Sequence, residues 1–333
     1  MTRTELQERL LNTLGRFADQ RIVILGDSIA DRFLHGSISR VSREAPVFIL
    51  QHQRTETSPG GAANCAMNMA ALGAYVSLVS VTGADEAGSE LRAKLEAAGV
   101  NIDGVVVSDK VQTTTKVRIL AGHSHSNKQQ VIIIDYEGAT LSDAEIREGI
   151  IKKLQRSIAT ANAVVISDYN YGVVNSEAID QIRTAEGMPV LVDSRFRLLE
   201  FTGFTAATPN EEEVENLAGA PVASVEELET ITKELKQRLG HRALLVTRGP
   251  QGMTLLEDGA PLHIPAVGAQ QAVDVTGAGD TVIGTFALAL ASGASFADAA
   301  RLANYAGGLV VMKRGTATVT RGELENAINS VES

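Results

Sequence analysis

Cysteine is almost missing from this 333-residue sequence, in which Cys65 is the only one. A single cysteine cannot form an intramolecular disulfide, and no Cys or Cys/His cluster stands at the spacing of a zinc site. These absences exclude a disulfide-stabilised scaffold and a small zinc module. They indicate a protein of a reducing compartment.

Positively charged residues are also fewer than negatively charged ones. The chain has 30 Lys and Arg residues against 40 Asp and Glu residues, so its formal net charge is −10. A negatively charged surface is repelled by nucleic-acid phosphates and by anionic lipid. We therefore expect neither nucleic acid nor a membrane as a partner.

Long apolar runs are absent as well. The least polar stretch, residues 281–291, contains Gly284 and is far shorter than the ~20 residues that a membrane-spanning helix needs. Charged residues are scattered through residues 1–20, so this segment lacks the apolar core of a signal peptide. We expect a cytoplasmic protein.

Short apolar runs, by contrast, alternate with amphipathic segments along most of the chain. The runs are residues 21–26, 76–81, 163–166, 190–193 and 243–247, and helical spacing is found at residues 6–17, 86–97, 143–158 and 224–239. This alternation predicts an α/β fold with a mainly parallel sheet and helices on both faces. Ligands bind such sheets beyond the carboxyl ends of the strands.

Two segments do not follow this alternation. Residues 33–53 and 111–136 are rich in β-branched side chains without helical periodicity, which predicts extra strands that form a small projecting sheet, or lid. No linker divides the chain, so we expect residues 1–333 to form one domain with these lid strands inserted. Apolar lid residues such as Phe48 and Ile133 would need cover, which predicts a homodimer through the lid.

The segment Asp274-Val-Thr-Gly-Ala-Gly-Asp280 carries the clearest chemical signal, and a helical stretch follows it. Gly277 and Gly279 allow the backbone to approach a ligand, and the first amides of a helix favour an anion. Asp280 beside such a site suits a base that faces an attacking hydroxyl, with its pKa kept low by the helix N-terminus. The alternative is a glycine turn with Asp280 as a helix cap.

This segment resembles the second signature of the PfkB, or ribokinase-like, carbohydrate kinases, and Pro59-Gly-Gly-Ala-Ala-Asn64 resembles the first. The similarity is collinear over nearly the whole chain. Within the family it is strongest to the heptose 7-phosphate kinases of lipopolysaccharide biosynthesis, through Gly26-Asp27, Arg40-Val-Ser-Arg-Glu-Ala-Pro46, Ser167-Asp-Tyr169 and Thr208-Pro-Asn210. The resemblance implies a Rossmann-like domain with a β-sheet lid that transfers phosphate from ATP to a sugar hydroxyl, with the anomeric hydroxyl of heptose 7-phosphate as the leading acceptor.

The resemblance also implies roles for single residues. Asp280 would be the base, and the amides of Gly277, Ala278 and Gly279 would form the anion hole. Nucleotide binding would fall to Asn210 and Glu213, with magnesium near Glu213, and to Thr247, Gly249 and Gly252; Asp274 and Thr276 would hold a monovalent cation such as potassium. Taken alone, residues 210–213 could equally be a capped helix start, and residues 247–252 a hairpin turn.

For the sugar, Asp27, Asp31 and Asn64 offer hydrogen-bonding side chains, and Gly60 and Gly61 would let backbone amides come close. Lys116 and Arg118 are two residues apart on an expected strand, so they share a face that meets either an anionic group or solvent. With Arg195 they are candidates for binding a substrate phosphate. His123 and His125 are expected in a surface loop.

The chain departs from the heptose kinase pattern at three positions. Tyr171 stands where those kinases carry lysine, Arg195 replaces a lysine, and Ile133 replaces an arginine. Any of these cations that pairs with a substrate phosphate would be weakened or lost here. The substrate could therefore be another sugar.

Other functional classes are less well supported. The sequence has no G-x-x-x-x-G-K-[ST] segment, and no G-x-G-x-x-G follows the first strand at Gly26, so the P-loop and the dinucleotide fingerprint are missing. A catalytically idle sugar- or nucleotide-binding protein of the same fold remains an alternative. Because the kinase pattern occupies essentially the whole chain, we expect no fused nucleotidyltransferase.

Overall fold

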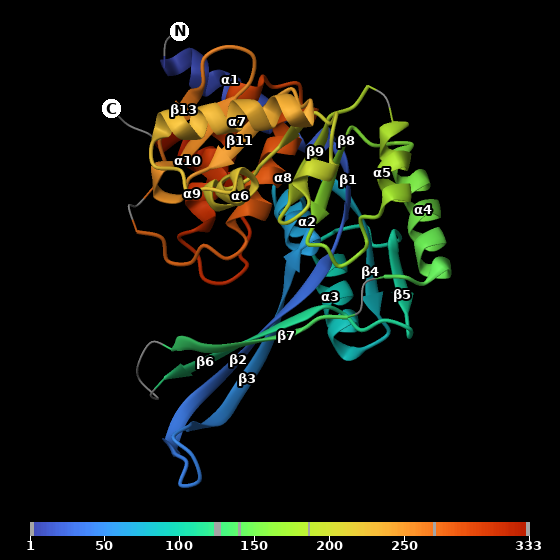
Figure 1. Cartoon of the computed structure of the whole chain (residues 1–333), viewed down its shortest axis with the longest axis vertical. Helices are drawn as coiled ribbons and strands as arrows, with labels where there is room; N and C mark the ends of the chain where they lie inside the picture. The colour runs from blue at the N-terminus through green and yellow to red at the C-terminus, as the bar shows by residue number, and fades with distance from the viewer. Residues whose placement is uncertain (1–2, 123–127, 139–140, 186, 269–270, 331–333) are drawn as a thin grey trace.

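The main sheet is mostly parallel, as its alternating sequence pattern predicts. The computed structural model describes residues 3–122, 128–138, 141–185, 187–268 and 271–330. The main sheet has the order β13-β12-β11-β10-β9-β8-β1-β4-β5 (Figure 1). Its parallel strands are β1 (Arg21–Gly26), β4 (Tyr75–Gly83), β5 (Val105–Ser108), β8 (Ala163–Asp168), β9 (Val190–Ser194), β10 (Ala206–Ala207) and β11 (Ala243–Thr247), and the antiparallel edge is β12 (Met253–Leu256) and β13 (Leu262–Ile264). This arrangement confirms the expected fold class.

Helices bury both faces of this sheet, because successive side chains of a strand point to opposite sides. In β8, Val165 belongs to one core cluster, while Val164 and Ile166 belong to the other. The first cluster is covered by α1 (Arg3–Gly15), α2 (Ala62–Ala71), α3 (Glu86–Ala97), α8 (Ala278–Ala291), α9 (Phe296–Val310) and α10 (Arg321–Ser330), and the second by α4 (Ala144–Ile158), α5 (Ser176–Arg183) and α7 (Val225–Leu239). The short α6 (Glu211–Ala218) packs beside α7.

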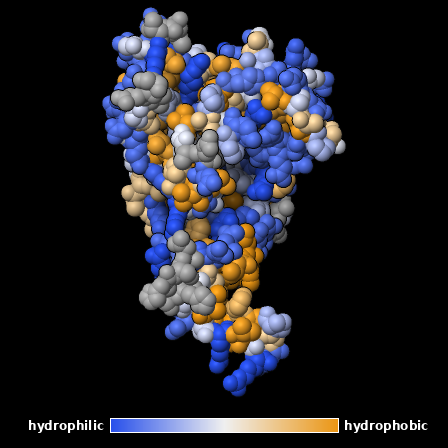
Figure 2. All heavy atoms as spheres, turned by 90° about the vertical axis from the view of Figure 1, so that its left-hand side faces the viewer, coloured by the Kyte–Doolittle hydropathy of each residue, from blue (hydrophilic) through white to orange (hydrophobic). Residues whose placement is uncertain are grey.

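A second, smaller sheet projects from this body (Figure 1). Its order is β3-β2-β6-β7, made of β2 (Ser28–Val41), β3 (Phe48–Gly61), β6 (Thr115–Gly122) and β7 (Gln129–Tyr136). We call it the lid. The first two lid strands extend beyond the expected segment 33–53 at both ends. β2 begins at Ser28, soon after β1, and β3 ends at Gly61. Figure 2 shows apolar side chains on the surface of the projecting lid. Phe48 on β3 and Ile132 on β7 are among the exposed apolar residues of the chain.

The strand order places a switch point between β1 and β8. From β1 the chain continues to β4 and β5 on one side, and the later strands β8 to β11 extend the sheet on the other. Loops that leave the carboxyl ends of β1 and β8 diverge there and leave room for a ligand. Within the ranges that the structure describes, no helix is both long enough and apolar enough to cross a membrane.

Candidate active site

A cavity of about 820 Å³ lies at the carboxyl ends of the parallel strands, beside the base of the lid. It is lined from the lid side by Asp31, from the strand ends by Asp193 and Thr247, and from α8 by Asp280. Of the residues that the sequence singles out, it brings together Asp31, Gly60, Gly61, Lys116, Arg118, Arg195, Asn210, Glu213, Thr247, Thr276, Gly277, Ala278, Gly279 and Asp280. Segments distant in sequence thus meet at one site, as expected for a parallel sheet.

Helix α8 begins at Ala278, three residues earlier than the sequence suggests, so Asp280 lies in its first turn. Gly277 is the N-cap with φ 75°, a left-handed conformation that favours glycine, and a Cβ there would collide with the Asn64 side-chain amide. The Ala278 amide, expected to face an anion, instead donates to the carbonyl of Val275 (3.2 Å). In this structure, therefore, that amide closes the turn before the helix.

Asp280 is buried and is held through both of its carboxylate oxygens. The Asn64 side chain donates to Oδ2 (2.7 Å), and the Tyr169 hydroxyl donates to Oδ1 (3.2 Å). Burial raises the pKa of Asp280 to about 7, although the hydrogen bonds from Asn64 and Tyr169 oppose the increase. The expectation that the helix N-terminus keeps this pKa low is therefore wrong, because desolvation outweighs it.

Asn64 has a different place from the one expected. It is buried on α2, and besides Asp280 it approaches the Gly277 carbonyl (3.4 Å). Its Oδ1 accepts a hydrogen bond from Asn68 (3.2 Å). Asn64 is not among the described residues that line the cavity, so here it supports Asp280 and does not face a sugar hydroxyl.

Asp27 also requires a correction, since its carboxylate does not line the cavity. Oδ2 accepts the backbone amides of Tyr169 (2.9 Å) and Tyr171 (3.2 Å), and Oδ1 accepts that of Val173 (3.1 Å). Burial raises the pKa of Asp27 to about 6, and these three hydrogen bonds oppose the increase. Asp27 thus fastens the loop after β8.

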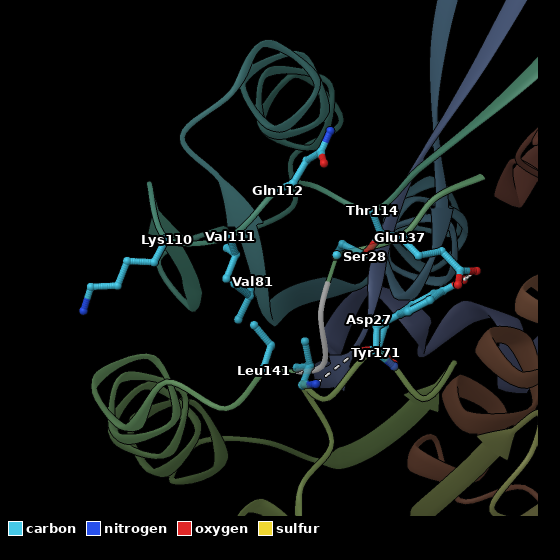
Figure 3. Close-up of a pocket in the computed structure, with 12 residues that line it drawn as sticks. Asp27, Ser28, Val81, Lys110, Val111, Gln112, Thr114, Glu137, Leu141 and Tyr171 are labelled. Atoms are coloured by element: carbon cyan, nitrogen blue, oxygen red, sulfur yellow. Dashed lines mark hydrogen bonds between the residues drawn. The ribbon is translucent and has the colours of Figure 1, made fainter. Parts of the chain in front are cut away.

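The side chain of Asp27 borders a separate, smaller pocket of about 270 Å³. Figure 3 shows this pocket, with Asp27, Ser28 and Tyr171 on one wall and the apolar Val81 and Leu141 on the other. It lies where β2 leaves the body. It is distinct from the cavity that contains Asp280.

Carboxylates crowd the floor of the main cavity. Burial and the neighbouring Glu213, Asp280 and Asp168 raise the pKa of Asp193 well above its usual value, and Arg195 opposes this. Burial likewise raises the pKa of Glu213. A cation bound nearby would relieve this repulsion. Asp193 was missed in the sequence, although its position at the end of a buried strand was a usable signal.

Asn210 and Glu213 form a capping box at the start of α6. The Asn210 side chain accepts the Glu213 amide (2.8 Å), and the Glu213 carboxylate accepts the Asn210 amide (2.9 Å). Both residues also line the cavity, so the helix-cap interpretation and a role at a ligand are compatible. In the described ranges no three His, Cys, Asp or Glu side chains come close enough to bind a metal by themselves.

The Thr247 segment forms a hairpin. Thr247 ends β11 and lines the cavity, a short 3₁₀ turn follows over Gly249–Gln251, and β12 returns antiparallel. Gly249 and Gly252 have φ of 51° and 86°, and a Cβ on Gly252 would collide with the Ile264 carbonyl. Neither glycine is among the described cavity residues, so both serve the turn here.

The lid presents paired charges to the cavity. Arg118 contacts Asp31 (3.1 Å), and Lys116 contacts Asp135 (3.2 Å) across neighbouring strands. Arg195 is exposed opposite them, with its guanidinium 5.7 Å from the centre of the Phe196 ring. Lys116 and Arg195 also line an adjoining pocket of about 400 Å³, together with Tyr171 and Asp135. A substrate anion here would compete with the lid carboxylates.

Asp274 lies beside the cavity and shapes the loop before α8. Its carboxylate accepts the amides of Thr276 (3.0 Å) and Gly315 (2.9 Å). Burial would raise its pKa, but these hydrogen bonds prevail and lower it.

Cys65 is fully buried, and burial raises the pKa of its thiol, which agrees with a packing role. His123 and His125 lie outside the described residues.

Comparisons with known proteins identify the family of the chain. The family model described as "pfkB family carbohydrate kinase" matches residues 20–321. "Bifunctional protein HldE" of Pectobacterium atrosepticum is 44% identical over 319 residues, and that of Aeromonas hydrophila 42% over 320 residues. Each alignment covers 95% of this chain, which spans only about 65% of the length of these relatives.

Solved structures share the fold. A ribokinase of Arabidopsis thaliana, complexed with ribose and ATP, superimposes with a TM-score of 0.73 at 23% identity, and phosphofructokinase-2 of Escherichia coli with 0.76 at 18% identity. Both alignments cover 93% of this chain and 98% of the other. The family match extends over nearly all the elements that build the cavity. The chain therefore belongs to the pfkB family of carbohydrate kinases.

Proposed function

We propose that this protein transfers the γ-phosphate of ATP to a sugar hydroxyl, with Asp280 as the general base. The observation that carries the proposal is the position of Asp280: buried in the first turn of α8, on the wall of the cavity, with both carboxylate oxygens held. A carboxylate fixed beside a helix N-terminus can accept a proton from a hydroxyl while the transferring phosphate faces the helix.

The pKa of Asp280, about 7, suits this role. A base whose pKa lies near the working pH is deprotonated in about half of the molecules and still attracts a proton strongly. In a loose phosphoryl-transfer transition state, the new bond forms late, so the proton leaves as the hydroxyl oxygen begins to bond. The amides of Gly277 and Gly279, at the start of α8, would take up charge on the transferring group.

The nucleotide would lie over the ends of β10 and β11. Asn210, Glu213 and Thr247 line this side of the cavity, and the carboxylates of Glu213 and Asp193 make it receptive to a cation. Magnesium bound there would neutralise phosphate charge. We also propose that the loop from Asp274 to Thr276 holds a potassium ion through its oxygens.

For the acceptor we propose the anomeric hydroxyl of heptose 7-phosphate. The sequence motifs support this substrate, as does the similarity to the HldE proteins over 95% of the chain. Lys116, Arg118 and Arg195 supply positive charge at the lid side of the cavity, where the sugar's own phosphate would bind. Tyr171 and Ile133 stand where the heptose 7-phosphate kinases carry a lysine and an arginine. A different sugar is therefore the second candidate.

We further propose a homodimer through the lid, one domain per chain, and a cytoplasmic location, where ATP is available. Along β7 every residue is exposed, including Val131, Ile132, Ile133 and Ile134. The lid of a second subunit would cover these side chains.

ADP release with a panel of hexoses, pentoses and heptoses, each with and without a terminal phosphate, tests the proposal. We expect the highest kcat/KM with heptose 7-phosphate, and unphosphorylated heptose is the matched control. A different best substrate would overturn the proposed sugar and leave the kinase assignment in place. No ADP release with any sugar would indicate an idle binding protein.

A further inference from the structure

The loop that follows β8 carries two tyrosines whose hydroxyls bind different partners. The Tyr169 hydroxyl donates to Oδ1 of Asp280 (3.2 Å), inside the main cavity. The Tyr171 hydroxyl donates to Oε1 of Glu137 (2.8 Å), directly after the lid strand β7 (Figure 3). Only one of the two therefore touches the proposed base, although both belong to the same short segment.

The backbone beneath Tyr169 is firmly fixed. Its amide is bound by the buried carboxylate of Asp27, which also binds the amides of Tyr171 and Val173. Asn170 adopts a positive φ of 64°, and its amide contacts Asp168 (3.3 Å). The loop can therefore hold the Tyr169 ring in one place. On its other side the ring packs close to Gly61, where a Cβ would lie 3.2 Å from Cε2 of the ring.

We propose that Tyr169 is a positioning residue for the base, which holds one oxygen of Asp280 while Asn64 holds the other. A carboxylate with a single donor can rotate about its Cβ–Cγ bond, whereas two donors on opposite oxygens fix its plane. One lone pair then stays directed at the sugar hydroxyl. This inference rests on the proposed function of Asp280.

The same contact adjusts the protonation of the base. Burial raises the pKa of the Tyr169 hydroxyl well above its usual value, so it stays a neutral donor. A donor to the carboxylate stabilises its charged form and lowers the pKa of Asp280. The other titratable groups near Asp280 are Asp31 on β2, Asp193 on β9 and the Cys65 thiol on α2. Among the residues that the structure describes, the hydrogen bonds to the Asp280 carboxylate come from Asn64 and Tyr169, so the Tyr169 hydroxyl is the donor that Oδ1 would lose.

Tyr169→Phe and Tyr171→Phe form a matched pair, because each removes one hydroxyl from the same loop and keeps the ring. We expect the acidic limb of the pH profile of kcat/KM, measured with MgATP and the best sugar of the panel, to move up by about one pH unit in Tyr169→Phe. Activity then falls about tenfold at pH 6 and much less at pH 9. In Tyr171→Phe the acidic limb should stay where it is in the parent, whatever happens to KM.

An equal loss at every pH, or an unmoved acidic limb, would show that Tyr169 is only a wall of the cavity. The thermal unfolding midpoint of each variant shows whether the fold is kept, and Tyr169→Thr, which retains a hydroxyl too short to reach, should shift the limb as Phe does. Asp280→Asn separates the two levels of the argument. If that variant stays active, the base assignment fails; if it is inactive while the limb of Tyr169→Phe is unmoved, only the role of Tyr169 fails.

Discussion

Strands β8 and β7 are both rich in valine and isoleucine, yet they lie in opposite surroundings. Every residue of β8 is buried between the two helical layers, and every residue of β7 is exposed at the edge of the lid. The body can therefore hold Asp280 and its supports rigidly, while the lid offers charges and apolar surface that another molecule can use. We expect changes around Asp280 and in the buried core to act on kcat and folding, and changes in the lid and at Arg195 to act on KM and assembly.

The largest expected effect is a loss of kcat caused by a change in the body. Asp280→Asn keeps the shape of the side chain and removes the base, so kcat should fall about 10²- to 10⁴-fold. ATP affinity should stay the same or rise slightly, because a negative charge near the phosphates disappears. Steady-state kinetics and nucleotide titration measure the two effects. A kcat within a few-fold of the parent would leave Asp280 only a structural role, as the acceptor for the Asn64 and Tyr169 side chains.

The second effect compares the two strands directly. Ile166→Ala in β8 removes a fully buried side chain and should cost about 2 to 5 kcal/mol of unfolding free energy. Ile133→Ala in β7 removes a side chain that is 47% exposed, and in an isolated chain it should cost under about 0.5 kcal/mol.

If a second subunit covers the lid, Ile133→Ala will instead lower the unfolding free energy in a way that depends on protein concentration. Urea unfolding at two concentrations, with light scattering, measures this. A parent protein that is monomeric at micromolar concentration would contradict the proposed dimer.

The third expected effect is on KM for the sugar and leaves kcat nearly unchanged. Lys116→Met and Arg195→Met each remove a charge that we propose contacts a substrate phosphate, so KM for a phosphorylated sugar should rise about 10- to 100-fold. KM for the unphosphorylated sugar and kcat should change by only a few-fold. Equal changes in KM for both sugars would assign these residues to the fold or to ATP.

The last expected effect depends on pH and concerns Asp27, whose pKa is raised from 3.8 to about 6 in the folded protein. The folded state then binds a proton more tightly than the unfolded state, so the contribution of this group to stability is greatest below pH 4. It declines as the pH rises through 6. Asp27→Asn cannot titrate, so its unfolding free energy should fall by about 1 to 3 kcal/mol less than that of the parent between pH 4 and 6.5. Parallel curves in urea unfolding would show that Asp27 stays charged.

The elements of the body could be predicted from the sequence because burial on both faces produces apolar runs with sharp ends. The run 21–26 coincides with β1, and 243–247 with β11. The position of the cavity could be predicted for a related reason, since residues just past the ends of parallel strands must lie at one edge of the sheet. The family assignment rested on the glycines and on Asp280, whose spacing is local in sequence.

What could not be predicted is the direction of each side chain at that edge. Asp27 follows β1 as a ligand-binding residue would, but the amides that occupy it belong to the loop after β8. Asn64 lies in the expected motif, yet the packing of α2 against α8 directs it to Asp280. The pKa of Asp280 depends on burial, which a sequence does not display. The contact of the Tyr169 hydroxyl with Asp280 joins residues 111 positions apart, so no local sequence pattern predicts it.

The connectivity of the lid determines when it can form. β2 pairs with its neighbour β3 as a local hairpin, and β6 with β7 as another, but the two hairpins join through parallel pairing that places Ala30 opposite Thr115. The chain between them forms α2, β4, α3 and β5, which belong to the body. Contacts this distant in sequence close late, because the intervening loop must first be shortened. During synthesis, the lid should therefore assemble only after this part of the body has folded, and the active site should be the last part of the molecule to mature.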